Sequence, residues 1–352
     1  MDIFPTAKLY IVSLMNDKKD GVIAGLVKIV LHLMSYLYRG ALNAVDWSYL
    51  SGLKKEHDIP VPVISVGNIT LGGTGKTPFT VYIADHFSAT GKKPAVLMRG
   101  YGDDEHKMLS DTLPDIRVYP GRNRLKKSRD ALKDGADLMI LDDGYQHRKI
   151  RRDLNILLLD CPAPFGNGFL FPRGILREPV SAVKRADIVI ITKSDSVDRE
   201  QKDRIVNRVK GLVPGIPVLT AAHEPVSVSD ITGNTYSLEV IRGKRICAVS
   251  GIADPGYFEF TIKKTGGIPS KYFRFPDHYC YSQRDIDRIY AGCLGANSEL
   301  ILVTGKDFVK MKTLDLSRVR DKLVVLNIKI EITEGEERLI AGLDSSLHGK
   351  GL

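Results

Sequence analysis

A glycine-rich loop between two apolar segments constrains the fold of this chain more than any other feature. The β-branched run Val61–Val66 has the composition of a buried parallel strand. After the loop, Pro78–Ser88 has the spacing of a helix with its apolar residues on one face. The loop itself, Thr70–Thr77, reads TLGGTGKT. Strand, glycine loop and helix in this order are the context that a Walker A loop, or P-loop, requires.

The P-loop pattern predicts a role for its residues. Backbone N–H groups of the glycines would cradle phosphates at the N-terminus of the following helix, where the helix dipole favours negative charge. Lys76 is expected to reach the β- and γ-phosphates, and the Thr77 hydroxyl is expected to bind Mg²⁺. The general pattern has glycine at position 70, where this chain has threonine, and the alternative reading is a glycine-rich turn without a ligand. The residues expected to bind the nucleotide are Thr70, Gly72, Gly73, Thr74, Gly75, Lys76 and Thr77.

Further apolar runs predict the rest of a sheet. Strands that alternate with helical stretches at this spacing indicate a doubly wound α/β fold, with a mostly parallel sheet between layers of helices. Ligands of such sheets bind at the carboxyl ends of the strands, where the charged motifs of this chain fall. The predicted strands are Ala95–Met98, Leu138–Leu141, Ile156–Leu159, Ile188–Ile191, Arg245–Val249, Leu300–Val303 and Leu323–Ile328.

Charged residues follow several of these strands directly. Asp142 and Asp143 come after the run LMIL, a Walker B arrangement in which one or both carboxylates hold Mg²⁺ directly or through water. The alternative is a pair of turn aspartates. Thr192–Asp195 reads TKSD and is similar to the guanine-reading element of GTPases, with threonine in place of its asparagine. A kinase also needs a group that receives the proton of the acceptor hydroxyl. The candidates are Asp103, Asp104, His147, Asp277 and His278.

The net charge indicates the kind of partner that the chain binds, and the cysteine usage indicates its redox compartment. The formal charge of +9 predicts an anionic partner, which could be nucleic acid, a lipid headgroup or a phosphorylated substrate. The sequence contains no aromatic-interleaved RNA motif or zinc-finger spacing, so nucleic acid is disfavoured. The four cysteines are widely separated without metal-ligand spacing, as expected for inert thiols in a reducing compartment.

An apolar stretch near the N-terminus predicts contact with a membrane. Val22–Tyr38 is interrupted by Lys28 and His32 and is shorter than a clean spanning helix. Its tyrosines precede Arg39, and Trp47 follows, as is typical of interfacial residues. We expect an amphipathic helix on an anionic membrane surface. A spanning helix and an ordinary packed helix remain alternatives.

The chain is expected to have three parts. Residues 1–50 form the membrane-associating helical segment, and residues 51–225 form the P-loop core. A polar, basic stretch containing Pro214 and Pro217 precedes the later strands. Residues 226–352 are therefore expected to form a smaller α/β domain.

Taken in order, the motifs of this chain resemble those of the tetraacyldisaccharide 4′-kinases, the lipid A 4′-kinases of Gram-negative envelopes. Thr70 fits this resemblance, because the family's loop has threonine there. The matching segments span about two-thirds of the chain. They are VGNITLGGTGKTP (Val66–Pro78), RGYG (Arg99–Gly102), DDGYQHR (Asp142–Arg148), FGNG (Phe165–Gly168), PRGILRE (Pro172–Glu178), RAD (Arg185–Asp187), SGIADP (Ser250–Pro255), FPDHY (Phe275–Tyr279) and TGKD (Thr304–Asp307).

The resemblance implies an activity and its partners. It implies transfer of the ATP γ-phosphate, with Mg²⁺, to the 4′-hydroxyl of an acylated glucosamine disaccharide 1-phosphate. It also implies a monotopic enzyme on the cytoplasmic face of the inner membrane, with two α/β domains closing over the nucleotide. A lipid substrate agrees with the interfacial helix, and its phosphate agrees with the basic net charge.

The resemblance also implies roles for residues outside the P-loop. His278 matches the histidine of an Asp-His-His motif that pairs with an aspartate to accept the hydroxyl proton. The aspartate's motif is shortened here; Asp104 aligns best, since Arg122 then keeps nearly its usual distance, and Asp103 is the rival. Smaller departures are His106 for a proline, Tyr279 for the second histidine and Gly305 for a glutamate. The residues that match the lipid and phosphate site are Gln146, His147, Arg177 and Glu178.

Two other functions remain compatible with a P-loop chain of this kind. The first is a regulatory P-loop NTPase, which would hydrolyse nucleotide without any acceptor. The second is a soluble small-molecule kinase or ligase whose N-terminal helix is merely packed. Acyl-chain preference and oligomeric state are not encoded in any recognisable motif.

Overall fold

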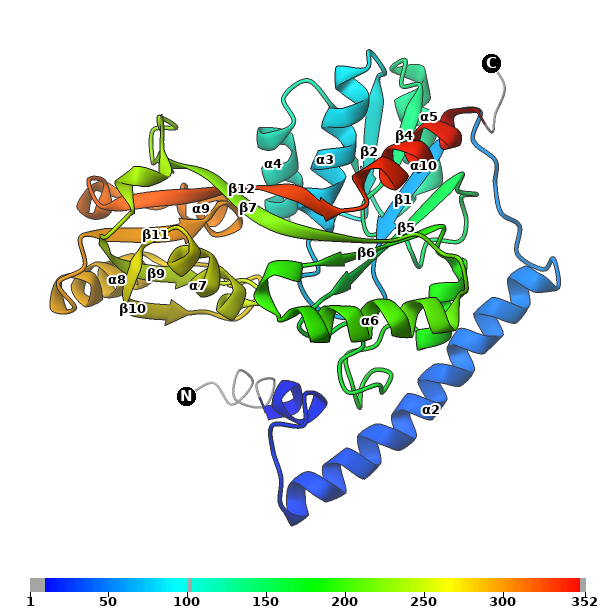
Figure 1. Cartoon of the computed structure of the whole chain (residues 1–352), viewed down its shortest axis with the longest axis horizontal. Helices are drawn as coiled ribbons and strands as arrows, with labels where there is room; N and C mark the ends of the chain where they lie inside the picture. The colour runs from blue at the N-terminus through cyan, green and yellow to red at the C-terminus, as the bar shows by residue number, and fades with distance from the viewer. Residues whose placement is uncertain (1–9, 101–102, 349–352) are drawn as a thin grey trace.

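A 12-stranded sheet runs through the chain (Figure 1). The structure, a computed structural model, describes residues 10–100 and 103–348. The strand order is β10-β9-β11-β12-β7-β6-β5-β1-β4-β2-β3, with β8 paired to β7. The strands are β1 (Val63–Gly67), β2 (Pro94–Met98), β3 (Arg117–Pro120), β4 (Leu138–Leu141), β5 (Leu154–Asp160), β6 (Ile188–Thr192), β7 (Val218–Asp230), β8 (Thr235–Tyr236), β9 (Arg245–Ser250), β10 (Ile268–Arg274), β11 (Leu300–Thr304) and β12 (Leu323–Glu334).

Helices cover the sheet, and short 3-10 turns connect some of the elements. The helices are α2 (Val22–Leu50), α3 (Lys76–Ala89), α4 (Asp103–Thr112), α5 (Arg124–Lys133), α6 (Arg199–Leu212), α7 (Pro255–Lys264), α8 (Gln283–Gly295), α9 (Gly305–Met311) and α10 (Glu336–His348). The 3-10 turns are η1 (Val180–Arg185), η2 (Ser194–Ser196), η3 (Leu238–Val240) and η4 (Ser317–Val319).

The first half of the chain builds the P-loop core. Its strands β3, β2, β4, β1, β5 and β6 are all parallel. One face of the sheet is covered by α3, whose Phe79, Ile83 and Phe87 pack with α4 and α10. The opposite face is covered by α5, η1 and α6. The predicted α/β sandwich with a mostly parallel sheet is thus confirmed.

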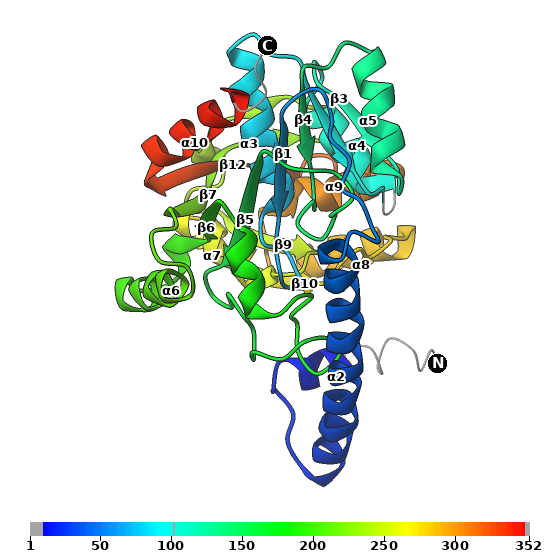
Figure 2. The same ribbon diagram turned by 90° about the vertical axis from the view of Figure 1, so that its right-hand side faces the viewer.

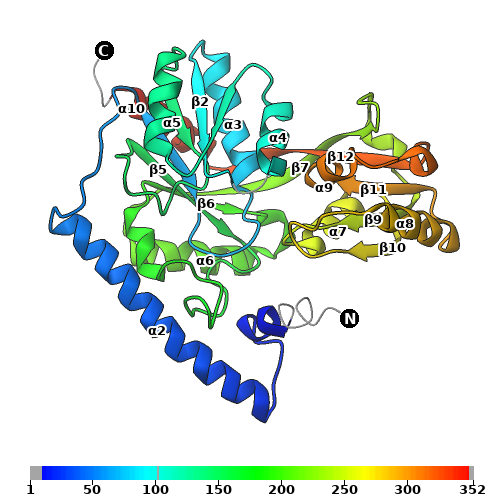
Figure 3. The same ribbon diagram turned by 180° about the vertical axis from the view of Figure 1, so that it is seen from behind.

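The second half of the chain continues the same sheet. Strands β12, β11, β9 and β10 are parallel to one another. The connection to the core is the long strand β7, which pairs in parallel with β6 and antiparallel with β12. Helix α7 packs on one face of these strands, and α8 and α9 pack on the other. Figures 1 and 3 show β7 and β12 running together between the two halves.

The expected boundary between residues 225 and 226 falls inside β7. The last helix, α10, returns to the core, where Leu339 and Leu343 join the apolar cluster of Ile64 and Phe79. The two halves are therefore linked by one continuous sheet and by a returning helix. The three-part division of the chain stays a prediction.

Helix α2 lies largely apart from both halves (Figures 1 and 2). It is the one helix of the described chain that is long and apolar enough to cross a membrane. The helix is longer than the predicted apolar stretch, because the polar continuation to Leu50 is also helical. Ala24, Leu31 and Ser35 are its buried residues.

Every strand predicted from an apolar run is present, whereas β3, β7, β8 and β10 were not predicted. The first of these, RVYP, is short and mostly half-buried. The edge strand β10 reads IPSKYFR and lacks a continuous apolar run because it has one free edge. Cys161, Cys247 and Cys293 are buried free thiols, and Cys280 is an exposed one.

Candidate active site

The P-loop is a tight turn between β1 and α3. Two of its glycines have a positive φ, 115° at Gly72 and 80° at Gly75, so the loop needs residues that tolerate a left-handed backbone. A Cβ at Gly75 would lie 2.7 Å from Nε2 of His223, which leaves no room for a side chain. Inside the loop, Asn68 Nδ2 donates to Thr74 Oγ1 at 3.0 Å. Helix α3 begins directly at Lys76, as a phosphate-binding helix N-terminus requires.

Threonine at position 70 has a structural reason. Thr70 is buried and forms an antiparallel bridge with Leu176, in the segment between β5 and η1. The N–H of Leu71 donates to Ile175 O at 2.7 Å, and the N–H of Arg177 donates to Ile69 O at 2.7 Å. The start of the loop is therefore paired like a short strand, a conformation in which a β-branched residue is favoured.

The aspartates after β4 face the P-loop lysine. Lys76 Nζ lies 3.8 Å from Asp143 Oδ1. Arg177 holds the same carboxylate with two hydrogen bonds, of 2.8 and 3.1 Å. Asp142 accepts a hydrogen bond of 3.0 Å from Thr80 Oγ1 on α3. The predicted P-loop and Walker B residues thus meet at the carboxyl end of the sheet.

The two aspartates have opposite protonation tendencies. Burial and the neighbouring Asp143 charge raise the pKa of Asp142 to about 6. Burial would also raise the pKa of Asp143, but the charges of Lys76 and Arg177 outweigh it and lower that pKa to about 2. Asp143 is therefore ionised throughout the neutral range, while Asp142 titrates near its lower end.

The donor set suits a magnesium ion. The Thr77 hydroxyl and the two carboxylates are hard oxygen donors, the kind that Mg²⁺ binds together with phosphate oxygens and water. The backbone around Asp142 and Asp143 is fixed by buried Arg124, which donates from its guanidinium to both of their carbonyl oxygens. Arg124 was not singled out from the sequence, since an arginine at the start of a polar helix carries no recognisable signal.

The residues expected at the acceptor site surround the same edge of the core. Gln146 Nε2 donates to Asn68 O at 2.8 Å, which ties the Walker B turn to the P-loop. Burial and the nearby Arg124 charge lower the pKa of His147 to about 4, so its imidazole is neutral at pH 7. Glu178 is buried and pairs with Arg185. Arg177 is held on Asp143, as described above.

His278 lies on the second half of the chain, in the turn after β10. Its φ is 60°, its side chain is 50% exposed, and Nε2 lies 3.7 Å from Asp277 Oδ2. Lys306, in the first turn of α9, also reaches Asp277, at 3.4 Å. Asp103 and Asp104 begin α4, but their side chains lie outside the part of the chain that the structure describes.

Helix α4 makes a direct contact between the two halves. It packs against α9, and Asp111 near its end pairs with Lys312 at 2.6 Å. The helix that begins with Asp103 and Asp104 is therefore in contact with the half of the chain that carries His278.

The TKSD segment lies against the P-loop, and its charged residues are paired. Thr192 Oγ1 donates to Thr74 O at 3.0 Å. Lys193 is buried between Asp160 at 2.7 Å and Asp254 at 2.6 Å. Asp195 accepts a hydrogen bond of 2.8 Å from Tyr257. The segment therefore supports the loop and joins it to α7 of the second half, which its resemblance to a guanine-reading element did not suggest.

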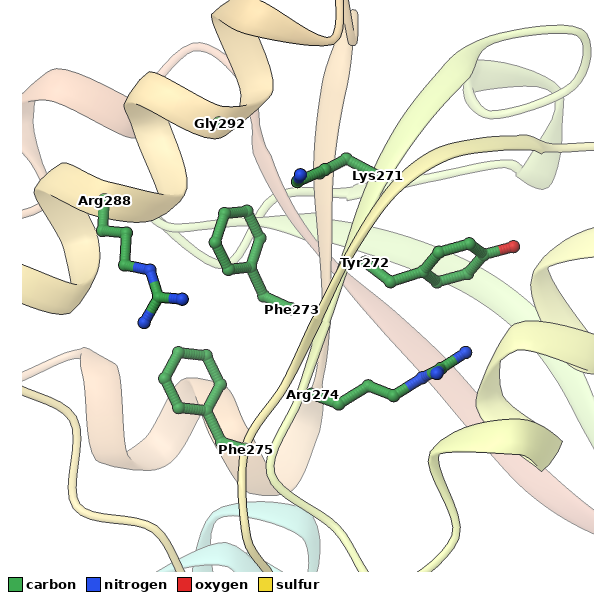
Figure 4. A pocket seen from close by; sticks show the side chains of 7 residues that line it. All are labelled: Lys271, Tyr272, Phe273, Arg274, Phe275, Arg288 and Gly292. Atoms are coloured by element: carbon green, nitrogen blue, oxygen red, sulfur yellow. The ribbon is translucent and has the colours of Figure 1, made fainter.

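A shallow pocket of about 480 Å³ lies between β10 and α8 (Figure 4). Figure 4 shows Phe273, Phe275 and Arg288 on one side of β10, and Tyr272 and Arg274 on the other. Its lining residues are Lys271, Tyr272, Phe273, Arg274, Phe275, Arg288 and Gly292. None of them was predicted as a site residue, and none belongs to the P-loop or to the turn after β4.

Comparison with known proteins identifies the family. The family model described as Tetraacyldisaccharide-1-P 4'-kinase matches residues 27–109 and 102–348. A tetraacyldisaccharide 4'-kinase from Pelobacter propionicus is 38% identical over 81% of this chain and 83% of its own length. One from Syntrophus aciditrophicus is 33% identical over 89% of this chain and 92% of its own length.

A solved structure agrees with these sequence relatives. The crystal structure of the "apo" form of LpxK from Aquifex aeolicus, in complex with ATP, superposes with a TM-score of 0.72 at 28% identity. The similarity covers 92% of this chain and 100% of that one. A P-loop, a Walker B turn and one continuous sheet thus occur together in a chain whose relatives match most of its length. This chain belongs to the tetraacyldisaccharide 4'-kinase family.

Proposed function

We propose that this chain transfers the γ-phosphate of ATP to the 4′-hydroxyl of a tetraacylated glucosamine disaccharide 1-phosphate, a step of lipid A biosynthesis. Family membership supports the reaction. The observation that carries it is the meeting of Lys76 and Arg177 on one carboxylate oxygen, Asp143 Oδ1, at 3.8 and 2.8 Å. Two cations beside a Walker B carboxylate suit a site where phosphate charge must be held during transfer.

The nucleotide site would work through charge and position. The N–H groups of the P-loop would hold the phosphates, and Lys76 would contact the β- and γ-phosphates. Thr77, Asp142 and Asp143 would hold Mg²⁺, which would supply positive charge to neutralise the charge that develops during transfer. When phosphates enter, Arg177 is close enough to exchange its contact with Asp143 for one with a phosphate oxygen.

The acceptor site would supply proton removal. In the transfer, the 4′-hydroxyl oxygen forms a bond to the γ-phosphorus, the bond to the bridging oxygen breaks, and ADP leaves. The hydroxyl proton would pass to His278, with Asp104 orienting the imidazole and raising its basicity. The packing of α4 on α9 supports this pairing, because it joins the helix of Asp104 to the half that carries His278.

The residues expected to bind the disaccharide fall into two groups. Gln146 and His147 follow the Walker B turn, and neutral His147 would accept or donate a hydrogen bond without adding charge. Arg177 would bind the anionic part of the substrate or nucleotide. Glu178 is paired with Arg185, so its expected role becomes indirect, through the position of Arg177 beside it.

The exposed face of α2 supports association with an anionic inner-membrane surface on the cytoplasmic side. Only 17% of the apolar window of this helix is buried, so an ordinary packed helix would leave most of its apolar surface in water. A lipid acceptor and an interfacial helix agree, since the substrate resides in the membrane. Residues 1–50 would then be the anchoring part, with residues 51–225 as kinase core and 226–352 as the second domain.

One assay tests the reaction against both rival functions. Labelled γ-phosphate should pass from ATP to tetraacyldisaccharide 1-phosphate, and lipid-free glucosamine should remain unlabelled. A regulatory NTPase would instead release labelled phosphate equally well without the acceptor. A soluble small-molecule kinase would label the lipid-free sugar, which would contradict the proposal.

A further inference from the structure

Two exposed aromatic side chains lie beside α2, in the segment Phe165–Arg177, which we call the strap. Phe169 is 36% exposed and Phe171 is 43% exposed. The ring of Phe169 lies edge-on to His32 with centroids 4.9 Å apart, and the ring of Phe171 lies edge-on to Tyr38 at 6.1 Å. The strap therefore places two exposed aromatic rings beside the helix.

Helix α2 carries its own stripe of exposed apolar residues. A contiguous apolar patch of this kind usually marks a site of contact, whereas single exposed apolar residues do not. The exposed apolar residues of this stripe are Val22, Ile23, Leu26, Ile29, Val30, Leu33, Met34 and Leu37.

Polar contacts make the strap and the helix one unit. Buried Ser35 donates from Oγ to Leu170 O at 2.8 Å and accepts the N–H of Arg173 at 3.1 Å. The guanidinium of Arg173 covers the Phe169 ring at 4.7 Å and pairs with Asp17 at 2.6 Å. The two phenylalanines cannot turn inward without breaking these contacts, so their exposure is built into the fold.

The other end of the strap reaches the catalytic edge. Ile175 and Arg177 form the backbone hydrogen bonds to the P-loop described above. Tyr38 Oη donates to Arg177 O at 2.9 Å, so α2 contacts the residue that holds Asp143. One short segment thus links the exposed apolar surface to the nucleotide site.

We propose that the strap is a second membrane-contacting element, in which Phe169 and Phe171 enter the interface of an anionic bilayer beside α2. This inference rests on the membrane association proposed for α2. Aromatic rings favour the headgroup boundary, and the exposed residues Lys18 and Lys19 just before α2 and Arg39 within it suit anionic headgroups. The strap would hold the P-loop edge at a fixed height above the lipid in which the acceptor resides.

Tryptophan fluorescence tests this arrangement directly. Trp47 is the single tryptophan of the chain, so the Trp47→Phe variant provides a dark background. In that background, Phe171→Trp reports the strap and Leu26→Trp reports α2. Tyr236→Trp is the matched control, because Tyr236 is also 43% exposed but lies on β8 in the other half. The vesicles contain phosphatidylglycerol and phosphatidylethanolamine, with or without brominated acyl chains.

The expected result is a blue shift and bromine quenching at positions 26 and 171, and neither at 236. Quenching at position 26 without quenching at 171 would overturn the strap as a membrane element while leaving the association of α2 intact. Absence of quenching at both positions would instead contradict the membrane association itself. Quenching at 171 only when a brominated-acyl substrate is supplied in detergent would assign the rings to substrate chains and overturn the proposal.

A binding measurement guards against a local effect of the reporters. The double variant Phe169→Ser/Phe171→Ser should weaken vesicle partitioning by about tenfold or more, because it removes two interfacial aromatic rings. Ile268→Ser/Leu294→Ser removes two apolar side chains of 53% and 48% exposure from the second half and should leave partitioning unchanged. Equal losses in the two double variants would contradict a specific role of the strap.

Discussion

The nucleotide side and the acceptor side of this site are built in different ways. The nucleotide side comes from one strand–loop–helix unit and a turn one strand away, joined by hydrogen bonds within the core. The proposed acceptor side would draw on Asp104, which follows β2, and on His278, which follows β10, and these strands lie near opposite ends of the sheet order. The first is complete once the core folds, whereas the second depends on how the two halves meet.

This difference predicts which substitutions should affect nucleotide binding and which should affect only phosphate transfer. The halves meet through β7 and β12, through α4 against α9, and through Lys193, which joins the core to Asp254. A change within the P-loop should therefore act on phosphate binding alone. A change at the dyad should leave nucleotide binding intact and reduce only the transfer step.

The largest effect is expected from Lys76→Ala. The ammonium group lies 3.8 Å from Asp143 and would contact the phosphates, so its loss should abolish measurable transfer to the lipid acceptor. The measurement is turnover with labelled ATP. Lys93→Ala, which changes an exposed lysine just before β2, is the matched control and should keep wild-type activity. Turnover in Lys76→Ala within tenfold of the wild type would contradict the nucleotide site proposed here.

The second-largest effect is expected from a substitution at the proposed acceptor side. Asp104→Ala should lower kcat by about 10²–10⁴-fold, the usual range for general acid–base catalysis. Its Kd for ATP should stay unchanged, because the nucleotide side is built separately. Asp103→Ala is the matched control on the same helical turn. A crippled Asp103→Ala with a silent Asp104→Ala would show that Asp103 is the dyad residue.

A third prediction uses the opposite protonation tendencies of the Walker B pair. The pKa of Asp142 rises from 3.8 to about 6 in the folded chain. Ionising this carboxyl above both values therefore lowers the free energy of unfolding by about 3 kcal/mol at most. The folded state binds the extra proton between these values, so stability falls as the pH rises through this window. Asp142→Asn should therefore raise the unfolding temperature of the metal-free protein at pH 8, with no gain below pH 4.

Asp143→Asn should have the opposite sign. The pKa of Asp143 is lowered to about 2, so its charged form stabilises the fold above the unfolded value of 3.8, and that contribution is lost as the pH falls toward 2. The asparagine variant loses the ion pairs with Arg177 and Lys76 and should unfold at a lower temperature at pH 8. Equal shifts in both variants would contradict the separate roles of the two carboxylates. Both variants should also bind ATP–Mg²⁺ more weakly.

The sequence predicted the nucleotide side well because its chemistry is local. Asp142 and Asp143 directly follow the apolar run of β4, Lys76 ends the glycine loop that follows the apolar run of β1, and adjacent parallel strands bring their carboxyl ends together. The family resemblance added Arg177, whose contact with Asp143 depends on a segment from beyond β5 and has no signature in spacing. Arg124, buried beneath the same turn, was missed for that reason.

The arrangement of the second half was harder to predict. Its strands β9, β11 and β12 have apolar runs. By contrast, β7, which connects the two halves, and β10, at the edge of the sheet, contain polar residues and show no regular alternation of apolar and polar side chains. The resemblance of TKSD to a base-reading element gave no sign of the ion pairs of Lys193 with Asp160 and Asp254, three residues that lie on separate elements. Pairings over such sequence distances are set by tertiary packing, which local patterns do not encode.

The smallest effect tests whether α2 influences the nucleotide side at all. Tyr38→Phe removes one hydrogen bond, the 2.9 Å contact from Oη to Arg177 O, and keeps the aromatic ring beside Phe171. A hydrogen bond of this kind contributes about 1 kcal/mol, so kcat with the vesicle-bound acceptor should fall by about fivefold. The Kd for ATP should be unchanged, since Lys76 and the P-loop amides are untouched. Tyr36→Phe, exposed on the same helix, is the matched control and should be silent. An equal loss in Tyr36→Phe would mean that the helix acts through the membrane alone, whereas a loss confined to Tyr38→Phe would show that it also positions Arg177.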